Sequence, residues 1–183
     1  MKLSILICSL ESRVDLLGEL MTTLSPQLTD DVELLIDADN GEIPIGAKRN
    51  CLLNNARGDH VCFVDDDDQI AANYVALILE ALATGPDCVG FKLAYYVNHR
   101  PKGVAIHSLR YERYGQQRTP GGMLYERTPN HLNPIRREIA LSVGFPELNH
   151  GEDSDFAQRV RPLLETEVFV DEVLYHYLFN SRK

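Results

Sequence analysis

The amino-acid sequence predicts an α/β protein built on an open, mostly parallel sheet, as a single domain over residues 1–183. Two observations lead to this fold class. Apolar strand-like runs alternate with segments of helical periodicity, beginning with residues 3–8, 14–24 and 32–36, which is the order of a βαβ unit. Polar residues follow the strand-like runs, at the edge where open α/β sheets bind their ligands. The sequence therefore predicts both a fold class and the place of a site.

The remaining elements follow in chain order. Apolar residues recur at helical spacing from Val14 to Leu24, and Pro26 ends that helix. Pro134 stands at the first position of a later helix, where proline is favoured. Residues 98–130 contain no clear helix, so we expect one or two β-hairpins over the site there. We expect strands over residues 3–8, 32–36, 61–64, 88–97, 168–170 and 173–179, and helices over residues 14–24, 45–56, 74–83, 134–143 and 154–164.

Composition and charge narrow the class of protein. Hydrophobic residues make up 44% of the chain and charged residues 25%, as in globular domains. The formal net charge of −9 argues against a duplex nucleic-acid partner, because such proteins bind phosphates through Lys and Arg. Cys8, Cys62 and Cys88 lie in or beside apolar runs without CxxC spacing, which indicates reduced core cysteines of a cytoplasmic protein. No segment reaches the length of a membrane span.

The central candidate site is a run of four carboxylates, Asp65 to Asp68, directly after the apolar strand of residues 61–64. Adjacent negative charges repel one another, and such a cluster is costly near a low-dielectric core unless a positive group neutralises it. Oxygen ligands favour a hard divalent cation, Mg²⁺, Mn²⁺ or Ca²⁺. The alternative is a solvated acidic turn that caps the next helix. A cap needs only one carboxylate, so we favour the metal site.

Other candidate residues lie at the neighbouring strand and helix ends. The second strand ends in the acidic run that contains Asp37 and Asp39. Lys48 and Arg49 lie in the first turns of the following helix, where side chains and free backbone N–H groups suit an anion. The alternative for this basic pair is a pair of solvated surface charges. Residues 98–130 carry a local basic excess, which fits either a diphosphate-neutralising face or a solvated one.

The carboxyl-terminal third adds an acidic helix start and a histidine. Glu152, Asp153 and Asp155 open the helix expected near residue 154, where they either complement the helix dipole or include a general base. His176 interrupts an apolar, aromatic run. A lone histidine in such a run is more often a hydrogen-bonded core residue than a ligand.

Taken together, these residues resemble family 2 glycosyltransferases of the GT-A fold. The resemblance rests on the polar end of the first strand, the aspartates ending the second, the Gly-Ala-Lys-Arg-Asn helix start, Phe-Val followed by the four aspartates, the later Gly-Glu-Asp and the late histidine. It covers residues 3–97 and 131–178 and is greatest for short, single-domain bacterial and viral members. It implies a Rossmann-like GT-A fold with helices on both faces of a mostly parallel central sheet, a small β-hairpin excursion near residues 98–130, and a location in the cytoplasm of a bacterium or virus-infected cell.

The resemblance also implies roles for the candidate residues. Asp65 and Asp67 match the Asp-x-Asp signature, which contacts the nucleotide ribose and coordinates Mn²⁺ or Mg²⁺ on the diphosphate. Asp153 occupies the position of the catalytic base, with Asp155 as a rival one helix step away. His176 matches a late histidine that supplies a metal ligand. The expected nucleotide-sugar contacts are Ser9, Asp37 or Asp39, Lys48, Arg49, Asp65 and Asp66, and the expected metal ligands are Asp67, Asp68 and His176.

The implied function is metal-dependent transfer of a sugar from a nucleotide-diphosphate sugar to an acceptor hydroxyl with inversion. A UDP-sugar donor and a saccharide acceptor are expected. One alternative is a metal-dependent nucleotidyltransferase, which would carry a glycine- and lysine-rich loop after the first strand; residues 9–13 contain no glycine. Another is a non-catalytic module that binds a nucleotide-sugar or a metal. It gives no reason for Asp153 and His176 to accompany the four aspartates.

Overall fold

The core of the fold is a parallel three-strand unit. In the computed structural model, which describes residues 1–179, β1 (Leu3–Leu10) pairs in parallel with β2 (Val32–Asp39) on one side and with β3 (His60–Phe63) on the other. The register matches Leu3 with both Val32 and His60. The carboxyl ends of the three strands therefore meet at one edge of the sheet, as expected from the sequence.

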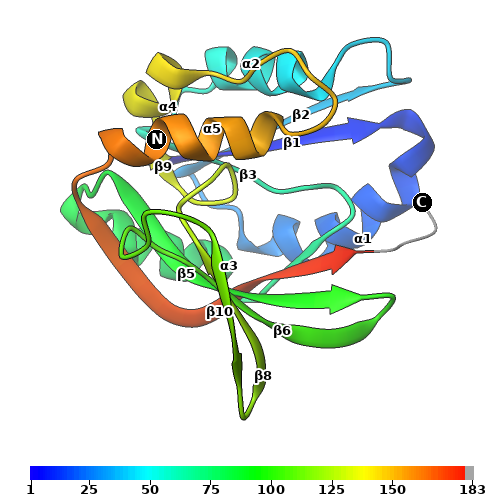
Figure 1. The fold of residues 1–183 in the computed structure, drawn as a ribbon. Helices are drawn as coiled ribbons and strands as arrows, with labels where there is room; N and C mark the ends of the chain where they lie inside the picture. The colour runs from blue at the N-terminus through cyan, green and yellow to red at the C-terminus, as the bar shows by residue number, and fades with distance from the viewer. Residues whose placement is uncertain (180–183) are drawn as a thin grey trace.

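Helices cover both faces of this unit, which confirms the predicted α/β architecture (Figure 1). Alternating side chains of β1 point to opposite faces. Ile5 and Ile7 belong to the core under α1 (Val14–Leu24) and α3 (Tyr74–Ala81). Leu6 and Cys8 belong to the core under the helices of the other face. Those helices are α2 (Ile45–Asn55), α4 (Arg137–Val143) and α5 (Glu152–Val160).

The second half of the sheet is mixed. Residues 98–130 take part in two hairpins, as expected from the sequence: β6 pairs back onto β5, which precedes this segment, and β7 pairs with β8 within it. The β7–β8 hairpin projects away from the helices in Figure 1. Within residues 1–179 the sheet runs β2-β1-β3-β9-β5-β6-β8-β7, with β10 paired to β5 and β4. The remaining strands are β4 (Gln69–Ile70), β5 (Cys88–Val97), β6 (Arg100–His107), β7 (Gly115–Thr119), β8 (Gly122–Arg127), β9 (Ile135–Arg136) and β10 (Glu167–Phe179), and the short 3-10 turns are Glu11–Arg13, Ser25–Gln27, Leu82–Thr84 and Arg161–Leu163.

Several expected strands and helices differ by one to three residues at their ends, and three expectations differ more substantially. The helix expected from Pro134 begins at Arg137, because Ile135 pairs as a strand with both Val61 and Cys88. The helix expected over residues 154–164 begins at Glu152, and its last turn is a 3-10 turn that contains Pro162. The two expected closing strands form the single strand β10, with a register irregularity between residues 170 and 175.

Burial of the cysteines agrees with the sequence expectation. Cys8, Cys62 and Cys88 are buried and Cys51 is exposed, and all four are free thiols. Burial raises the pKa of the Cys62 thiol to about 12. No helix within residues 1–179 has the length and apolar character that a bilayer crossing requires.

Candidate active site at the carboxylate edge

The four aspartates follow β3 at the carboxyl edge of the parallel strands and divide into two pairs. Asp65 and Asp67 keep 27% and 23% of their side chains exposed, whereas Asp66 and Asp68 are each 2% exposed. All four adjoin a cavity of about 460 Å³ that Arg13, Arg49 and Tyr177 also line. The two exposed carboxylates are therefore the ones that can meet a ligand.

Asp66 joins the tetrad to the first strand. One carboxylate oxygen accepts a hydrogen bond from Ser9 Oγ at 2.7 Å, and the other accepts one from Arg13 Nη1 at 2.9 Å. Ser9 is itself buried. The sequence placed Ser9 and Asp66 among the nucleotide-sugar contacts; in the structure they bind each other, so we leave both out of the proposed ligand contacts.

Asp68 is fixed to β10. Its oxygens accept hydrogen bonds from Tyr175 Oη at 2.9 Å and from the backbone N–H of Leu178 at 2.7 Å. Burial, together with the negative charge of Asp65, raises the pKa of Asp68 well above its usual range. A carboxyl that is enclosed and engaged in this way is a poor metal ligand. We therefore leave Asp68 out of the proposed metal ligands.

Arg49 is the cation that holds the exposed edge in place. Its guanidinium is 4% exposed, donates from Nη2 to Asp65 at 3.1 Å, and lies 3.4 Å from Glu152 through Nε. It also lies over the ring of Phe63 at 5.0 Å and that of Phe145 at 5.8 Å. Among the described residues, no group accepts a hydrogen bond from its Nε or Nη1 atoms. Buried donors of this kind usually find a partner, so Arg49 has donor capacity for a ligand.

The electrostatics of Asp65 follow from its neighbours. Burial alone would raise its pKa, but the charge of Arg49 and the imidazole of His131 hold the pKa well below the usual range. His131 Nε2 lies 3.5 Å from the carboxylate. The backbone carbonyl of His131 accepts a hydrogen bond from Phe63 N–H, which explains why this loop residue lies beside β3. Asp65 is thus an anion across the physiological pH range.

The two aspartates of β2 differ in their surroundings. Asp39 accepts from Lys48 Nζ and from the backbone N–H groups of Gly41 and Ile43. Lys48 Nζ also donates to the carbonyl of Ser9 at 2.7 Å, which ties the ends of β1 and β2 together. Asp37 lines a separate shallow groove between β2 and α2. The structure thus places neither of them on the cavity beside Asp65, and Lys48 serves to join the strands.

The expectation of free N–H groups at the start of α2 is wrong. Ile45 N–H donates to Asn149 Oδ1 at 3.2 Å, and Gly46 N–H donates to the carbonyl of Leu148 at 3.1 Å. A Cβ at Gly46 would meet the carbonyl oxygen of Pro146 at 1.8 Å, so only glycine permits this loop to lie on the helix. The loop before α5 is thereby fixed against α2, and it occupies the N–H groups of Ile45 and Gly46, two of the donors that an anion would use.

The acids that open α5 have three separate positions. Glu152 is buried beside Arg49. Asp153 is half-buried and lines a cavity of about 570 Å³ with Asp65. Asp155 forms an i,i+4 ion pair with Arg159 on the helix surface. Of the two rival bases, Asp153 is therefore the one that shares a cavity with the tetrad.

His176 does not lie with the tetrad. Its neighbours Tyr175 and Tyr177 face Asp68 and the cavity beside Asp65. Consecutive strand side chains alternate between faces, and His176 packs on the other side beside Tyr96, with ring centroids 6.1 Å apart. Across residues 1–179, no three His, Cys, Asp or Glu side chains form a group that could hold a metal. His176, which the resemblance gives as a metal ligand, thus packs beside Tyr96 on the face of β10 opposite Tyr175 and Tyr177.

The structure adds residues that the sequence reasoning missed. The ring of Tyr95 contacts those of Tyr125 and Tyr177, with centroids 5.3 and 5.4 Å away, and all three rings line the cavity that contains Asp65 and Asp153. They come from three strands, β5, β8 and β10. Period-two alternation in the strand of residues 88–97 could have placed Tyr95 on one face, but no local signal brings the three rings together.

Fold and site define an α/β protein of the GT-A type, with an acid-lined cleft at the carboxyl edge of its parallel strands. The chain belongs to glycosyl transferase family 2, whose family model matches residues 5–140. It is 32% identical over 145 residues to the succinoglycan biosynthesis protein ExoM of Rhizobium meliloti (strain 1021), a match that covers 75% of this chain and 44% of ExoM. The chain thus spans less than half the length of that relative.

Solved structures of S. aureus TarS share the fold. The TarS 1–349 complex with UDP-GlcNAc superposes with a TM-score of 0.74 at 19% identity, covering 100% of this chain and 60% of that one. The TarS 1–349 complex with UDP gives a TM-score of 0.74 at 19% identity, covering 97% and 60%. At these identities the likeness concerns the fold.

Proposed function

We propose that this chain transfers a sugar from a nucleotide-diphosphate sugar, with UDP as the nucleotide, to a hydroxyl of a saccharide acceptor, with inversion. The observation that carries the proposal is that two cavities meet at one point. The cavity beside the exposed aspartates and the cavity beside Asp153 share Arg49, Asp65 and Tyr177. A diphosphate site and a candidate base are thereby brought to a common centre.

The donor occupies the cavity beside Asp65 and Asp67 in this proposal. Arg13 and Arg49 border it and supply positive charge for the diphosphate. Arg49 Nη1, which has no acceptor among the described residues, is available to phosphate or sugar oxygens. The TarS structures hold UDP or UDP-GlcNAc on the same fold, which supports a UDP-sugar as the donor class.

A divalent cation, Mn²⁺ or Mg²⁺, fits the two exposed carboxylates. Mg²⁺ in nucleotide enzymes is held by one or two carboxylates together with substrate phosphates, without a complete protein cage. Asp65 and Asp67 provide such a pair, and both adjoin the donor cavity. When bound, the cation supplies Lewis-acid stabilisation of the departing diphosphate.

Asp153 acts as the general base in this proposal. As the acceptor oxygen forms a bond to the anomeric carbon, the bond from that carbon to the diphosphate oxygen breaks, and the hydroxyl proton passes to the Asp153 carboxylate. A single displacement of this kind inverts the anomeric configuration. Asp153 is half-buried in the cavity, and one of its oxygens accepts from Ser154 N–H at 2.8 Å, which fixes its orientation.

The test measures hydrolysis and transfer with a panel of nucleotide-sugars, Mn²⁺ and mixed saccharide acceptors. Asp67→Ala should lose both reactions, whereas Asp153→Asn should retain UDP binding by calorimetry and lose transfer. Asp155→Asn is the matched control on the same helix and should transfer at the parent rate. Equal turnover by the parent and Asp67→Ala, or no turnover of any donor by the parent, would refute the proposal. Retained transfer by Asp153→Asn would remove its assigned role.

A further inference from the structure

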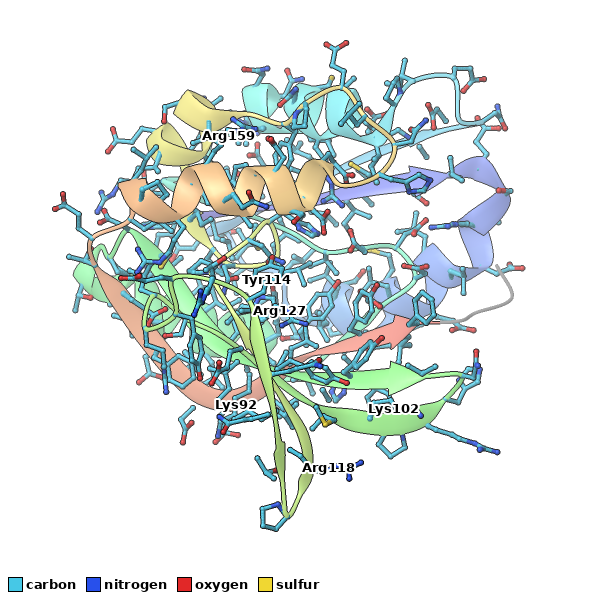
Figure 2. The ribbon with its side chains drawn as sticks, viewed as in Figure 1. Lys92, Lys102, Tyr114, Arg118, Arg127 and Arg159 are labelled. Atoms are coloured by element: carbon cyan, nitrogen blue, oxygen red, sulfur yellow. The ribbon has the colours of Figure 1, made fainter. Side chains whose placement is uncertain are left out.

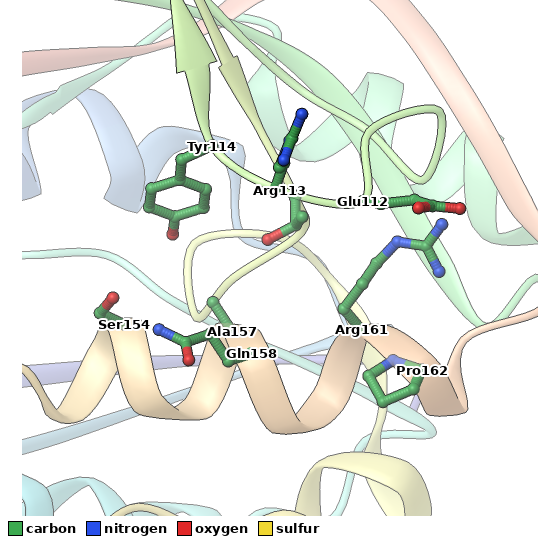
Figure 3. Close-up of a pocket in the computed structure, with 9 residues that line it drawn as sticks. Glu112, Arg113, Tyr114, Ser154, Ala157, Gln158, Arg161 and Pro162 are labelled. Atoms are coloured by element: carbon green, nitrogen blue, oxygen red, sulfur yellow. The ribbon is translucent and has the colours of Figure 1, made fainter.

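A second large cavity opens between the α5 face and the loop that precedes β7. It has a volume of about 680 Å³, which is within the range of clefts that bind small-molecule ligands. Figure 3 shows Arg113 and Tyr114 on the loop above, with Ser154 and Gln158 on α5 below. We call this cavity the α5 groove. Its lining combines an aromatic face with hydroxyl, amide and guanidinium groups.

The α5 groove is continuous with the proposed transfer cleft through Tyr114, which lines both cavities. Tyr114 as a whole residue is 44% exposed, and the guanidinium of Arg127 lies 4.7 Å from its ring centroid. Figure 2 shows the two side chains next to each other. Burial of the phenol and the negative charge of Asp153 raise the pKa of Tyr114. The phenol is therefore within electrostatic reach of the proposed base.

The loop over the α5 groove is held by a dense set of bonds. Arg161 donates to the carbonyls of Tyr111 at 3.0 Å and Leu109 at 2.6 Å. Glu167 accepts from Ser108 Oγ at 2.7 Å and from Leu109 N–H at 2.8 Å. These bonds fix the start of the loop, directly before its lining residues Glu112 to Tyr114, which reduces the ordering cost of binding a ligand there.

We propose that the α5 groove binds the acceptor as a saccharide chain of two or more units and delivers its terminal hydroxyl past Tyr114 to Asp153. Sugar rings present an apolar face to an aromatic ring and hydroxyls to polar side chains. Tyr114 supplies the aromatic face, and Ser154 and Gln158 supply the hydrogen-bonding groups. This inference rests on the proposed function and assigns its acceptor site to the space between α5 and the loop before β7.

The test follows transfer to gluco-, galacto- and N-acetylgluco-configured acceptors of one to five sugar units. Gln158→Trp fills the α5 groove, and Gln116→Trp on the exposed face of β7 is the matched control. We expect the parent KM to fall by about tenfold between one and three units. Gln158→Trp should abolish that advantage and lower the ratio of transfer to donor hydrolysis by about tenfold, whereas Gln116→Trp should behave as the parent.

A second variant keeps the test independent of the bulk of tryptophan. Tyr114→Ala should raise acceptor KM for every length, and Tyr114→Phe should restore most of the loss because the ring remains. A misfolded variant lowers transfer and hydrolysis together, so the ratio identifies it. If acceptor KM does not depend on length in the parent, or if Gln158→Trp matches Gln116→Trp, the groove is not the acceptor site. Failure of the parent to hydrolyse or bind any donor would instead refute the proposed function.

Discussion

Substitution of Arg49 tests whether one buried guanidinium neutralises the carboxylates of the site. Its guanidinium is enclosed between Phe63 and Phe145 and contacts two carboxylates, Asp65 and Glu152. Arg49→Met keeps most of the side-chain volume and removes the charge. Both carboxylates then lose their cation, and Glu152 keeps only 7% of its side chain exposed.

The expected decrease in the free energy of unfolding follows from these contacts. Removal of one partner from a buried ion pair costs roughly 3–5 kcal/mol. Since Asp65 is 27% exposed, solvent screens part of its charge, and we expect a loss of about 3 kcal/mol. For a chain of this size that corresponds to a fall in Tm of roughly 6–12 °C. Urea unfolding followed by circular dichroism measures the loss as a change in midpoint at constant slope.

Two further variants make the result specific. Arg118→Met, at the tip of the β7–β8 hairpin (Figure 2), should change stability by less than about 0.5 kcal/mol. Glu152→Gln combined with Arg49→Met should cost less stability than the sum of the two single changes, because the double variant has no Glu152 carboxylate left without a cation. A loss below about 1 kcal/mol for Arg49→Met would mean that the guanidinium does not compensate these carboxylates.

Three more predictions concern stability. Burial lowers the pKa of His107 to about 4, below the unfolded value of about 6.5. The free energy of unfolding of the parent should therefore fall by up to about 3 kcal/mol as pH falls from 6.5 to 4, and urea titrations of His107→Gln should not show this loss. Burial raises the pKa of Asp87, but hydrogen bonds from the N–H groups of residues 165 and 166 and from Arg136 outweigh it and lower that pKa. The stabilisation by Asp87 is therefore present above pH 3.8 and is lost as pH falls through the lower folded pKa, so Asp87→Asn should cost about 1–3 kcal/mol at pH 7 and match the parent's stability in acid. A stability difference that stays constant with pH would contradict this. Gly46→Ala should lower Tm, since its Cβ would meet the Pro146 carbonyl at 1.8 Å, by an overpacking cost of about 1–3 kcal/mol; an unchanged melting curve would show that the loop moves freely.

The parallel core could be predicted from the sequence because its signals are local. The helix of residues 14–24 and the strand of residues 88–97 have the expected boundaries, since apolar periodicity and the flanking Gly and Pro residues define them. The position of the tetrad at the carboxyl edge follows from strand order alone. In contrast, Ile135 lies in a strand because two distant strands pair with it, and tertiary pairing of this kind leaves no local pattern.

The division of the four aspartates could not be predicted for the same reason. Asp66 and Asp68 are indistinguishable from their neighbours in sequence, yet Ser9 and Tyr175 bind them from other strands. The placement of His176 depends on which face of β10 it occupies, and that follows from pairing with β4 and β5. Residues such as His131 reach the site through backbone pairing to β3, which the sequence does not mark.

The most direct test of the account is calorimetric titration of the parent protein with UDP in the presence and absence of Mn²⁺. We expect UDP binding to weaken by at least about tenfold when EDTA removes the cation, and by a similar factor in Asp67→Asn with Mn²⁺ present. Arg118→Met should bind UDP as the parent does. Equal affinity with and without the cation, or no binding of UDP under either condition, would contradict the assignment of the carboxylate edge as a metal-assisted diphosphate site.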